Sequence, residues 1–214
     1  MKGILFTEPL FHQVVCGEKT QTRRIINPQP EGAVIPVVKA IDGELFLDDN
    51  SKTVIGKHGY TSSEHGYFEP RYKPGEKLYL KEPYHIDSGN EVLYKYAKAP
   101  AVRKCLKWQN KLFMPAKFAR YFIEITGVRM ERLQDISNGD CLKEGIFKTD
   151  LTDGKGWDHY DWINRSAPVS GWNINPRSAY ASLIDSIGGK GTWDRNPYVF
   201  VYDFKLTNKT SETK

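Results

Sequence analysis

The stretch "ARYFIEITGVRMERL", residues 119–133, is predicted to form one long β-strand. Its β-branched and aromatic residues suit a pleated, half-buried surface, and we expect Tyr121 or Phe122 to lie in the core. Gly127 interrupts the stretch, and a glycine inside a strand often marks a β-bulge. We therefore expect a long strand with a bulge, and its partners must come from segments on either side.

Five other segments have strand character. The segment "EKLYLKEPYHI" (76–86) alternates Leu78 and Leu80 with lysine and tyrosine, and "VLYKYA" (92–97) is a candidate to pair with it. The others are "GILF" (3–6) and "KTQTRRII" (19–26) near the start of the sequence, and "NPYVFVYDFKL" (196–206) near its end.

Three segments carry helix signals at both ends. They are "TEPLFHQVVCG" (7–17), "SNGDCLKEGI" (137–146) and "NPRSAYASLIDSIGG" (175–189). Each begins with a residue that favours the N-cap and ends with a glycine that stops the helix: Thr7 and Gly17, Ser137 and Gly145, Asn175 and Gly188. Asp140, three residues after Ser137, completes a capping-box pattern.

Strands outnumber helices and are too widely separated for a parallel βαβ order, which predicts an α+β fold. A small, partly open β-barrel with flanking helices is the solution we expect. Residues 27–75 are broken by prolines and glycines and are predicted to be a long irregular insertion. Inside it, Asp42-Gly43 in "AIDGELFL" is a hairpin signal. We expect one domain over residues 1–206 and a polar tail over 207–214.

The composition is that of an ordinary globular chain. Of 214 residues, 39% are hydrophobic and 27% charged, and the net charge of +5 suits a polyanionic partner without requiring one. The three cysteines have no paired spacing, which favours a reducing compartment. No run is apolar enough for a signal peptide or a membrane span, so we expect a cytoplasmic protein with no membrane partner.

The segment "CGEKTQTRRI", residues 16–25, gathers groups that could do chemistry. Thr22 is a weak nucleophile unless a base takes its proton, and Lys19 could be that base if its amine is neutral. Burial and the neighbouring charges of Arg23 and Arg24 would lower the pKa of Lys19. Positions 19 and 22 point to opposite faces of a regular strand, so we expect a loop that enters a strand.

Several pieces, taken in order, resemble the ASCH family, a branch of the PUA-like barrel folds. They are "GEKTQTRR", "PGEKLYLKEPY", "MPAKFARYFIEITGVRMERLQDIS", "CLKEGI" and "LIDSIGGKGTWDRNPYVFVYDFK". The longer members encoded by phages and prophages are most similar, and they also carry an insertion before the "PGEKLYL" strand. The resemblance spans nearly the whole chain and implies the barrel.

The resemblance also implies a site. Related members hydrolyse the N4-acyl amide of acetylated cytidine with a lysine, a threonine three residues later and a glutamate in the helix after the central strand. Lys19, Thr22 and Glu144 match those positions. The implied chemistry needs no metal and no cofactor, and the glutamate would protonate the leaving amine or hold a water. The plainer alternative is a solvated salt bridge beside a turn hydroxyl.

A second candidate feature is the acid-free stretch 92–123. Its lysines and arginines alternate with aromatic residues, which suits single-stranded nucleic acid because cations meet phosphates and rings stack on bases. The binding residues expected there are Lys104, Lys107, Trp108 and Arg120, with Arg23 and Arg24 near the first motif. The alternative is that the rings are core and the lysines a soluble face.

Other residues carry weaker signals. Glu82 and Tyr84 follow a buried strand, where they could line the mouth of a pocket, although an arginine partner for Glu82 is an equal alternative. The five histidines lack metal-ligand spacing. Cys16 has no inferable partner and is expected to be a buried thiol.

These features predict a protein that contacts a nucleobase, a nucleoside or single-stranded RNA, with hydrolysis of an N4-acyl amide of cytidine as the leading activity. Three alternatives remain open: a non-catalytic module that binds RNA or a modified base, a ribonuclease that uses the same basic cleft, and a phage-encoded interaction protein with a vestigial pocket.

Overall fold

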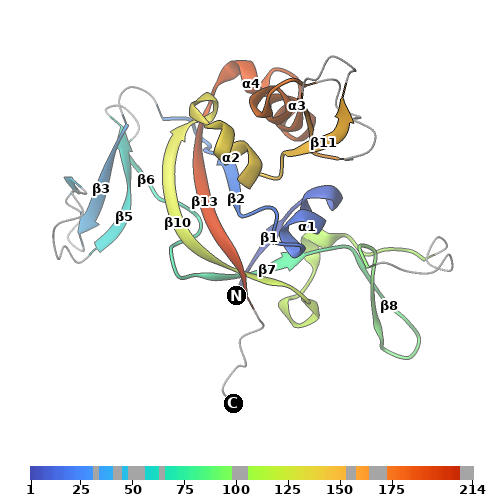
Figure 1. The fold of residues 1–214 in the computed structure, drawn as a ribbon. Helices are drawn as coiled ribbons and strands as arrows, with labels where there is room; N and C mark the ends of the chain where they lie inside the picture. Colours follow the sequence, from blue (N-terminus) through green and yellow to red (C-terminus); the bar gives the residue numbers. More distant parts are fainter. Residues whose placement is uncertain are drawn as a thin grey trace.

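A computed structural model of the chain describes residues 1–30, 34–40, 45–47, 56–62, 66–97, 106–152, 158–163 and 173–207. The fold is mixed α+β, as predicted, and its centre is a five-stranded mixed sheet (Figure 1). The strand order is β1 (Lys2–Leu5), β7 (Lys77–Lys81), β10 (Phe122–Arg132), β13 (Tyr198–Thr207) and β2 (Gln21–Ile25). β1 and β7 are parallel, and the other neighbours are antiparallel.

The long strand β10 confirms the predicted bulge. Its pairing with β13 changes register between Ile125, opposite Phe204, and Gly127, opposite Asp203. Before the bulge, β10 pairs with both β7 and β13. After the bulge, it pairs only with β13 among the described strands. The two strands curve together through the middle of the molecule (Figure 1), which is the bend that a bulge produces.

The small, partly open β-barrel stays a prediction. β1 and β2 are the two edges of the sheet, and no ladder joins them among the residues that the structure describes. Both edge strands nevertheless come from the first 25 residues and flank the helix α1 (Glu8–Val15).

The three predicted helices are present, and two of them have the predicted N-cap hydrogen bonds. In α2 (Asn138–Lys143) the Ser137 hydroxyl accepts from the Asp140 amide, and in α3 (Pro176–Gly188) the Asn175 side chain accepts from the Ser178 amide. Thr7 stands at the N-cap of α1 but makes no cap hydrogen bond. The remaining helical pieces are α4 (Thr192–Arg195) and the short 3-10 turns η2 (Lys111–Phe113), η3 (Ala116–Phe118) and η4 (Leu133–Asp135).

The insertion is more regular than predicted. It contains a four-stranded antiparallel sheet in the order β4 (Leu45–Leu47), β3 (Val34–Ala40), β5 (Gly56–Ser62) and β6 (Gly66–Phe68). β3 and β4 pair as the predicted hairpin requires, although its turn at Asp42-Gly43 lies outside the described residues. The prolines obscured these strands because proline is normally rare within sheets.

Two small hairpins complete the fold. The segment 76–86 was expected to be one strand, but it breaks at Glu82 and Pro83 into β7 and β8 (Tyr84–Ile86). β8 pairs with β9 (Val92–Tyr94), which confirms the pairing expected for residues 92–97. The other hairpin joins β11 (Phe147–Thr152) to β12 (Asp158–Asp161).

The main core lies between the five-stranded sheet and the helices α1, α2 and α3. Leu10 and Phe11 from α1, Cys141 from α2 and Tyr180 from α3 pack in the same cluster as residues of the sheet strands. This packing brings the end of α2 against the start of β2, where the residues of the first motif lie. Within the described residues, no helix is both long and apolar enough to cross a membrane.

Candidate functional site

The first motif is a loop that enters a strand, as predicted. α1 ends at Val15, Gly17 adopts a φ of +79°, and regular structure resumes at Gln21 in β2. The backbone amides of Glu18 and Lys19 donate to the carbonyl of Gln13, which turns the chain inward. This turn directs the Lys19 side chain into the interior.

Lys19 and Glu144 form a buried ion pair. The Lys19 Nζ lies 2.6 Å from Glu144 Oε2 and also donates to the Glu144 backbone carbonyl at 2.6 Å. The two side chains are only 1% and 4% exposed. Burial lowers the pKa of the Lys19 amine below its ordinary value of 10.5; Glu144 acts in the opposite direction, and Arg24 and Arg23 add to the lowering.

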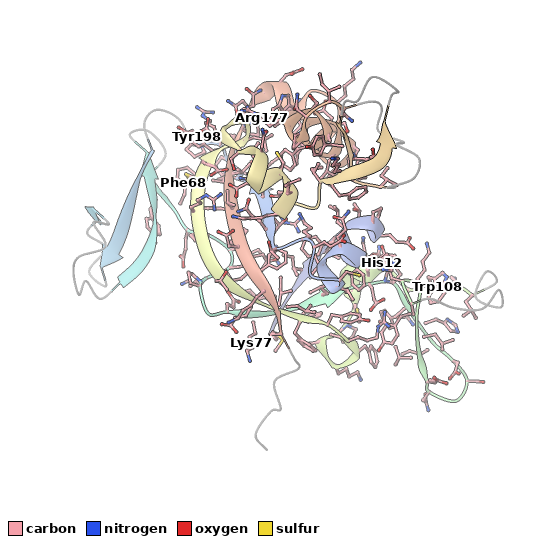
Figure 2. All side chains as sticks on the ribbon, viewed as in Figure 1. His12, Phe68, Lys77, Trp108, Arg177 and Tyr198 are labelled. Atoms are coloured by element: carbon pink, nitrogen blue, oxygen red, sulfur yellow. The ribbon has the colours of Figure 1, made fainter. Side chains whose placement is uncertain are left out.

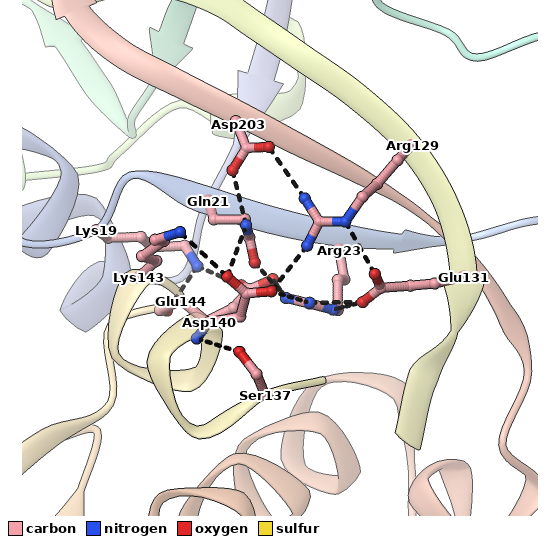
Figure 3. A network of polar contacts seen from close by, with 10 residues as sticks. All are labelled: Lys19, Gln21, Arg23, Arg129, Glu131, Ser137, Asp140, Lys143, Glu144 and Asp203. Atoms are coloured by element: carbon pink, nitrogen blue, oxygen red, sulfur yellow. Dashed lines mark hydrogen bonds and ion pairs between the residues drawn. The ribbon is translucent and has the colours of Figure 1, made fainter. Parts of the chain in front are cut away.

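The second carboxylate oxygen of Glu144 is bound by Arg23. Arg23 Nη1 donates to Glu144 Oε1 at 3.0 Å and to Gln21 Oε1 at 2.6 Å, while its Nη2 lies 2.6 Å from Glu131 Oε1. Figure 3 shows Arg23 between β10 and α2, with Glu131 on one side and Glu144 on the other. Both oxygens of Glu144 therefore have a cationic partner.

This pair belongs to a wider network in which the formal charges balance (Figure 3). Arg129 donates to Glu131, Asp140 and Asp203, and Lys143 donates to Asp140. The four cations are Lys19, Arg23, Arg129 and Lys143, and the four carboxylates are Glu131, Asp140, Glu144 and Asp203. The network ties β2, β10 and β13 to α2, which holds Glu144 in place.

A cavity of about 230 Å³ adjoins the pair, and Lys19, Thr22 and Glu144 all line it. Thr22 is 4% exposed, and no hydrogen bond of its side chain is recorded among the described residues. The apolar wall comes from Leu5, Phe6, Leu10, Leu183, Ile184 and Ile187. The structure therefore brings the three predicted residues to one cavity, with Lys19 and Glu144 in direct contact.

Two further polar residues line this cavity and were not predicted to do so. The Thr7 hydroxyl is buried and has no hydrogen-bond partner among the residues that the structure describes. Lys111 Nζ donates to the Phe6 carbonyl at 2.6 Å, and burial lowers the pKa of its amine. Thr7 had a strong signal as a helix cap, and Lys111 was one of many lysines in its stretch, so neither pattern pointed to the cavity.

Arg23 and Arg24 differ in their surroundings. Arg23 is bound by carboxylates in the network. Arg24 lines the cavity, donates to the Leu5 carbonyl at 2.7 Å and lies over the Phe6 ring. Burial lowers the pKa of its guanidinium, although the nearby Tyr72, Glu144 and other groups oppose that effect.

Glu82 and Tyr84 lie away from this cavity. Glu82 is 1% exposed and accepts two hydrogen bonds from Arg120, at 2.9 Å and 2.7 Å. Tyr84 packs in a second apolar cluster with Tyr79, Met114, Ala119 and Phe122. Of the two alternatives for Glu82, the arginine partner is the one observed, and Tyr84 is a core residue.

We expect Arg120→Met to lower the free energy of unfolding by about 3 kcal/mol, because the buried Glu82 carboxylate would lose its only recorded ion-pair partner among the described residues. Urea denaturation measures this change. Lys117→Met, which removes an exposed cation from the same region, should change stability by less than about 1 kcal/mol. Equal stability of the two variants would show that the Glu82–Arg120 pair does not support the fold.

The basic stretch 92–123 is divided in the structure. Trp108 is half-buried beside the β8–β9 hairpin (Figure 2), with its ring 6.4 Å from that of His85. Lys107 is exposed, and Lys104 lies outside the described residues. Tyr96 is buried in the main core, and Arg120 is held by Glu82. Nucleic-acid binding by this stretch stays a prediction. The Tyr96 ring and the Arg120 guanidinium already have partners inside the protein.

The cysteines correct one expectation. Cys16 is exposed, because it caps the end of α1 at the surface, so the prediction of a buried thiol was wrong for this residue. Cys141 is the buried one, and burial raises the pKa of its thiol to about 12. Among the described residues, no group of three or more His, Cys, Asp or Glu side chains is arranged to hold a metal ion.

The candidate site is thus a small cavity lined by a buried lysine–glutamate pair, by Thr22 and by several apolar side chains. Buried ionisable groups beside a cavity are a common feature of functional sites, although structural ion-pair networks also contain them. Comparison of the chain with models of known protein families, with curated proteins and with solved structures finds no match.

Proposed function

We propose that this protein binds an N4-acylated cytosine base in the 230 Å³ cavity and hydrolyses its amide bond. The observation that carries the proposal is that Lys19, Thr22 and Glu144 line one cavity although 125 residues separate the lysine from the glutamate. The resemblance to ASCH-type barrels supports the same assignment of roles. In this proposal Thr22 is the nucleophile, Lys19 its base and Glu144 the acid.

The buried pair can supply both proton-transfer groups at once. A proton moved over the 2.6 Å from Lys19 Nζ to Glu144 Oε2 leaves a neutral amine and a neutral carboxylic acid. The neutral amine can accept the proton of Thr22, and the carboxylic acid can donate one. Burial favours the neutral amine, because it lowers the pKa of Lys19. Arg23 also binds Glu144 and favours its charged carboxylate. It therefore limits the fraction of molecules in which the lysine–glutamate pair is neutral.

The reaction then needs two steps. In the first, Thr22 Oγ1 bonds to the acyl carbon while its proton passes to Lys19; the bond from that carbon to N4 breaks, and N4 takes the proton of Glu144. This leaves free cytidine and an ester on Thr22. In the second, a water oxygen bonds to the ester carbon, one water proton passes to Glu144, and Lys19 returns its proton to the departing Thr22 oxygen. The carboxylic acid is released, and the starting protonation is restored.

The cavity suits a ligand group of nucleobase size. Its 230 Å³ is below the roughly 300–1,000 Å³ of sites for drug-sized ligands. The apolar wall formed by Leu183, Ile184 and Ile187 could pack on the face of a planar ring. The Thr7 hydroxyl, which has no hydrogen-bond partner in the described part of the chain, could bind a polar edge of the base or the acyl oxygen.

A non-catalytic module for a modified base is the second candidate. It is favoured by the complete pairing of Glu144, which binds Lys19 through one oxygen and Arg23 through the other. Such a network can be purely structural, and the cavity would then bind a base without changing it. The two candidates share the ligand and differ only in turnover.

The pH dependence of acetate release from N4-acetylcytidine tests the proposal. If the working pair holds one shared proton, kcat/KM must fall as pH rises through the pKa of Lys19, because the last proton of the pair is then lost. Burial lowers that pKa, so the fall should lie below pH 10.5. Acetate is measured in buffer with EDTA. Activity that instead rises through this range would remove Glu144 as the proton donor, and tight binding without any acetate would favour the non-catalytic module.

A further inference from the structure

A second, larger cavity of about 650 Å³ adjoins the first. Leu5 and Arg24 line both cavities, so the two share a wall. The larger one is bounded by β1, the end of β2, the segment 67–72 that leaves the insertion, and the side chains of Lys81, Leu112, Phe200 and Tyr202. None of its lining residues belongs to the Lys19–Glu144 pair.

Three cations line this cavity without a carboxylate partner. Arg24 donates to the Leu5 carbonyl at 2.7 Å, and Lys81 donates to the Leu112 carbonyl at 2.6 Å. The exposed Arg71 guanidinium lies over the Tyr72 ring, 5.6 Å from its centroid. Among the described residues, none of the three is in an ion pair. This contrasts with the balanced network around Glu144 and leaves a concave surface with uncompensated positive charge.

Glu69 is the one acidic residue among the described residues that line the cavity, and it is paired. Its carboxylate lies 2.8 Å from the ammonium of Lys73, four residues further along the chain. Among the described residues, Glu69 forms no ion pair with Arg24, Arg71 or Lys81. A cavity of this charge attracts anions, and its low-dielectric walls strengthen that attraction.

The walls of the cavity are firmly held. The Tyr202 hydroxyl accepts from the Arg71 amide at 3.1 Å, and the Tyr72 hydroxyl donates to the Gly3 carbonyl at 3.3 Å. A Cβ at Gly3 would collide with the Lys81 side chain and the Tyr79 ring. Glycine at this position therefore lets the Lys81 side chain cross β1 and reach the cavity that Arg24 and Arg71 also line.

We propose that this cavity is a phosphate-binding site, in which Arg24, Arg71 and Lys81 bind the phosphate of a nucleotide. Phosphate oxygens accept several charge-assisted hydrogen bonds at once, and arginine matches their geometry with two donors. Because Arg24 and Leu5 also wall the smaller cavity, the base of the same ligand would enter there. This last step rests on the proposed function and makes the substrate a phosphorylated cytidine, free or within RNA, and not the nucleoside.

The test is binding of unacylated cytidine 5′-monophosphate, cytidine and ribose 5-phosphate, measured by calorimetry at low and high salt. We expect the monophosphate to bind at least about tenfold more tightly than cytidine, with a preference that weakens as salt rises. Arg71→Gln combined with Lys81→Gln should abolish this preference. Lys190→Gln combined with Lys205→Gln removes the same charge from two exposed lysines that line neither cavity and should leave the preference unchanged.

The outcomes separate this site from the proposed hydrolysis. If the monophosphate and cytidine bind equally, or the Arg71/Lys81 variant keeps the preference, the phosphate site is refuted. If the preference holds but no acylated cytidine is hydrolysed, the phosphate site stands and the amidohydrolase does not. A single-stranded cytidine-containing oligonucleotide without a terminal phosphate identifies the source: tight binding that the double variant loses assigns an internal phosphodiester, and weak binding assigns the terminal phosphate.

Discussion

Thr22→Val is expected to lower acetate release from N4-acetylcytidine by about a thousandfold or more, because valine keeps the shape of the side chain but has no oxygen to attack the acyl carbon. Among the described residues the Thr22 hydroxyl makes no hydrogen bond that the substitution would break, and valine suits a strand. The free energy of unfolding should therefore change by no more than about 1 kcal/mol. Both quantities can be measured on the same purified sample.

Thr20→Val provides the matched control. Thr20 lies two residues earlier in the loop, is half-buried and does not line the cavity. This variant should retain nearly full activity. Wild-type turnover in the Thr22 variant would show that Thr22 is not the nucleophile. Loss of activity in both variants would point instead to a general effect of altering this loop.

Lys19→Met is expected to lower the free energy of unfolding by about 3–5 kcal/mol, because it removes one partner of an ion pair whose side chains are 1% and 4% exposed. The Glu144 carboxylate would still be bound by Arg23 but would lose its ion pair with the Lys19 ammonium. The Glu144 backbone carbonyl would also lose the hydrogen bond that this ammonium donates. Lys205→Met, in an exposed pair with Glu124, should change stability by less than about 1 kcal/mol. Urea denaturation compares the two variants.

A second substitution distinguishes loss of the ion pair from loss of packing. In Lys19→Met combined with Glu144→Gln, no unpaired carboxylate remains, while Arg23 keeps Glu131. The double variant should therefore be more stable than the sum of the two single effects predicts, by about 1–3 kcal/mol. Strict additivity would show that the lysine and the glutamate support the fold independently.

Because Lys19→Met affects folding, loss of activity in that variant cannot by itself identify Lys19 as the base. Lys19→Arg is the better variant for this purpose, because arginine keeps the positive charge but cannot accept the proton of Thr22.

Features that depend on neighbouring residues were predictable from the sequence. The caps of α2 and α3, formed by Ser137 and Asn175, bind amides three residues away. The bulge at Gly127 and the loop at Gly17 arise from single glycines in otherwise regular patterns. In each case the deciding interaction is within one turn of helix or a few residues of strand, so the local pattern contains it.

Other features depend on which distant segments meet. Strands in the insertion were missed because its prolines and glycines resemble an irregular loop, whereas pairing with neighbours supplies the missing stability. The partner of Glu82 was left open between two alternatives because a carboxylate in a sequence gives no indication of which cation will lie opposite. Cys16 was predicted to be buried but is exposed. Its exposure depends on which side of the end of α1 packs against the rest of the fold, and the sequence near Cys16 does not show this.

The sequence by itself determined the α+β character, the long bulged strand, the capped helices and the candidate residues Lys19, Thr22 and Glu144. Only the tertiary structure decided that Lys19 and Glu144 form a buried pair, since packing of α2 against β2 closes a separation of 125 residues. It also decided that Arg23 is neutralised by carboxylates while Arg24, its neighbour in the strand, is not. Successive strand residues face opposite sides, so two adjacent arginines enter different surroundings that no local pattern distinguishes.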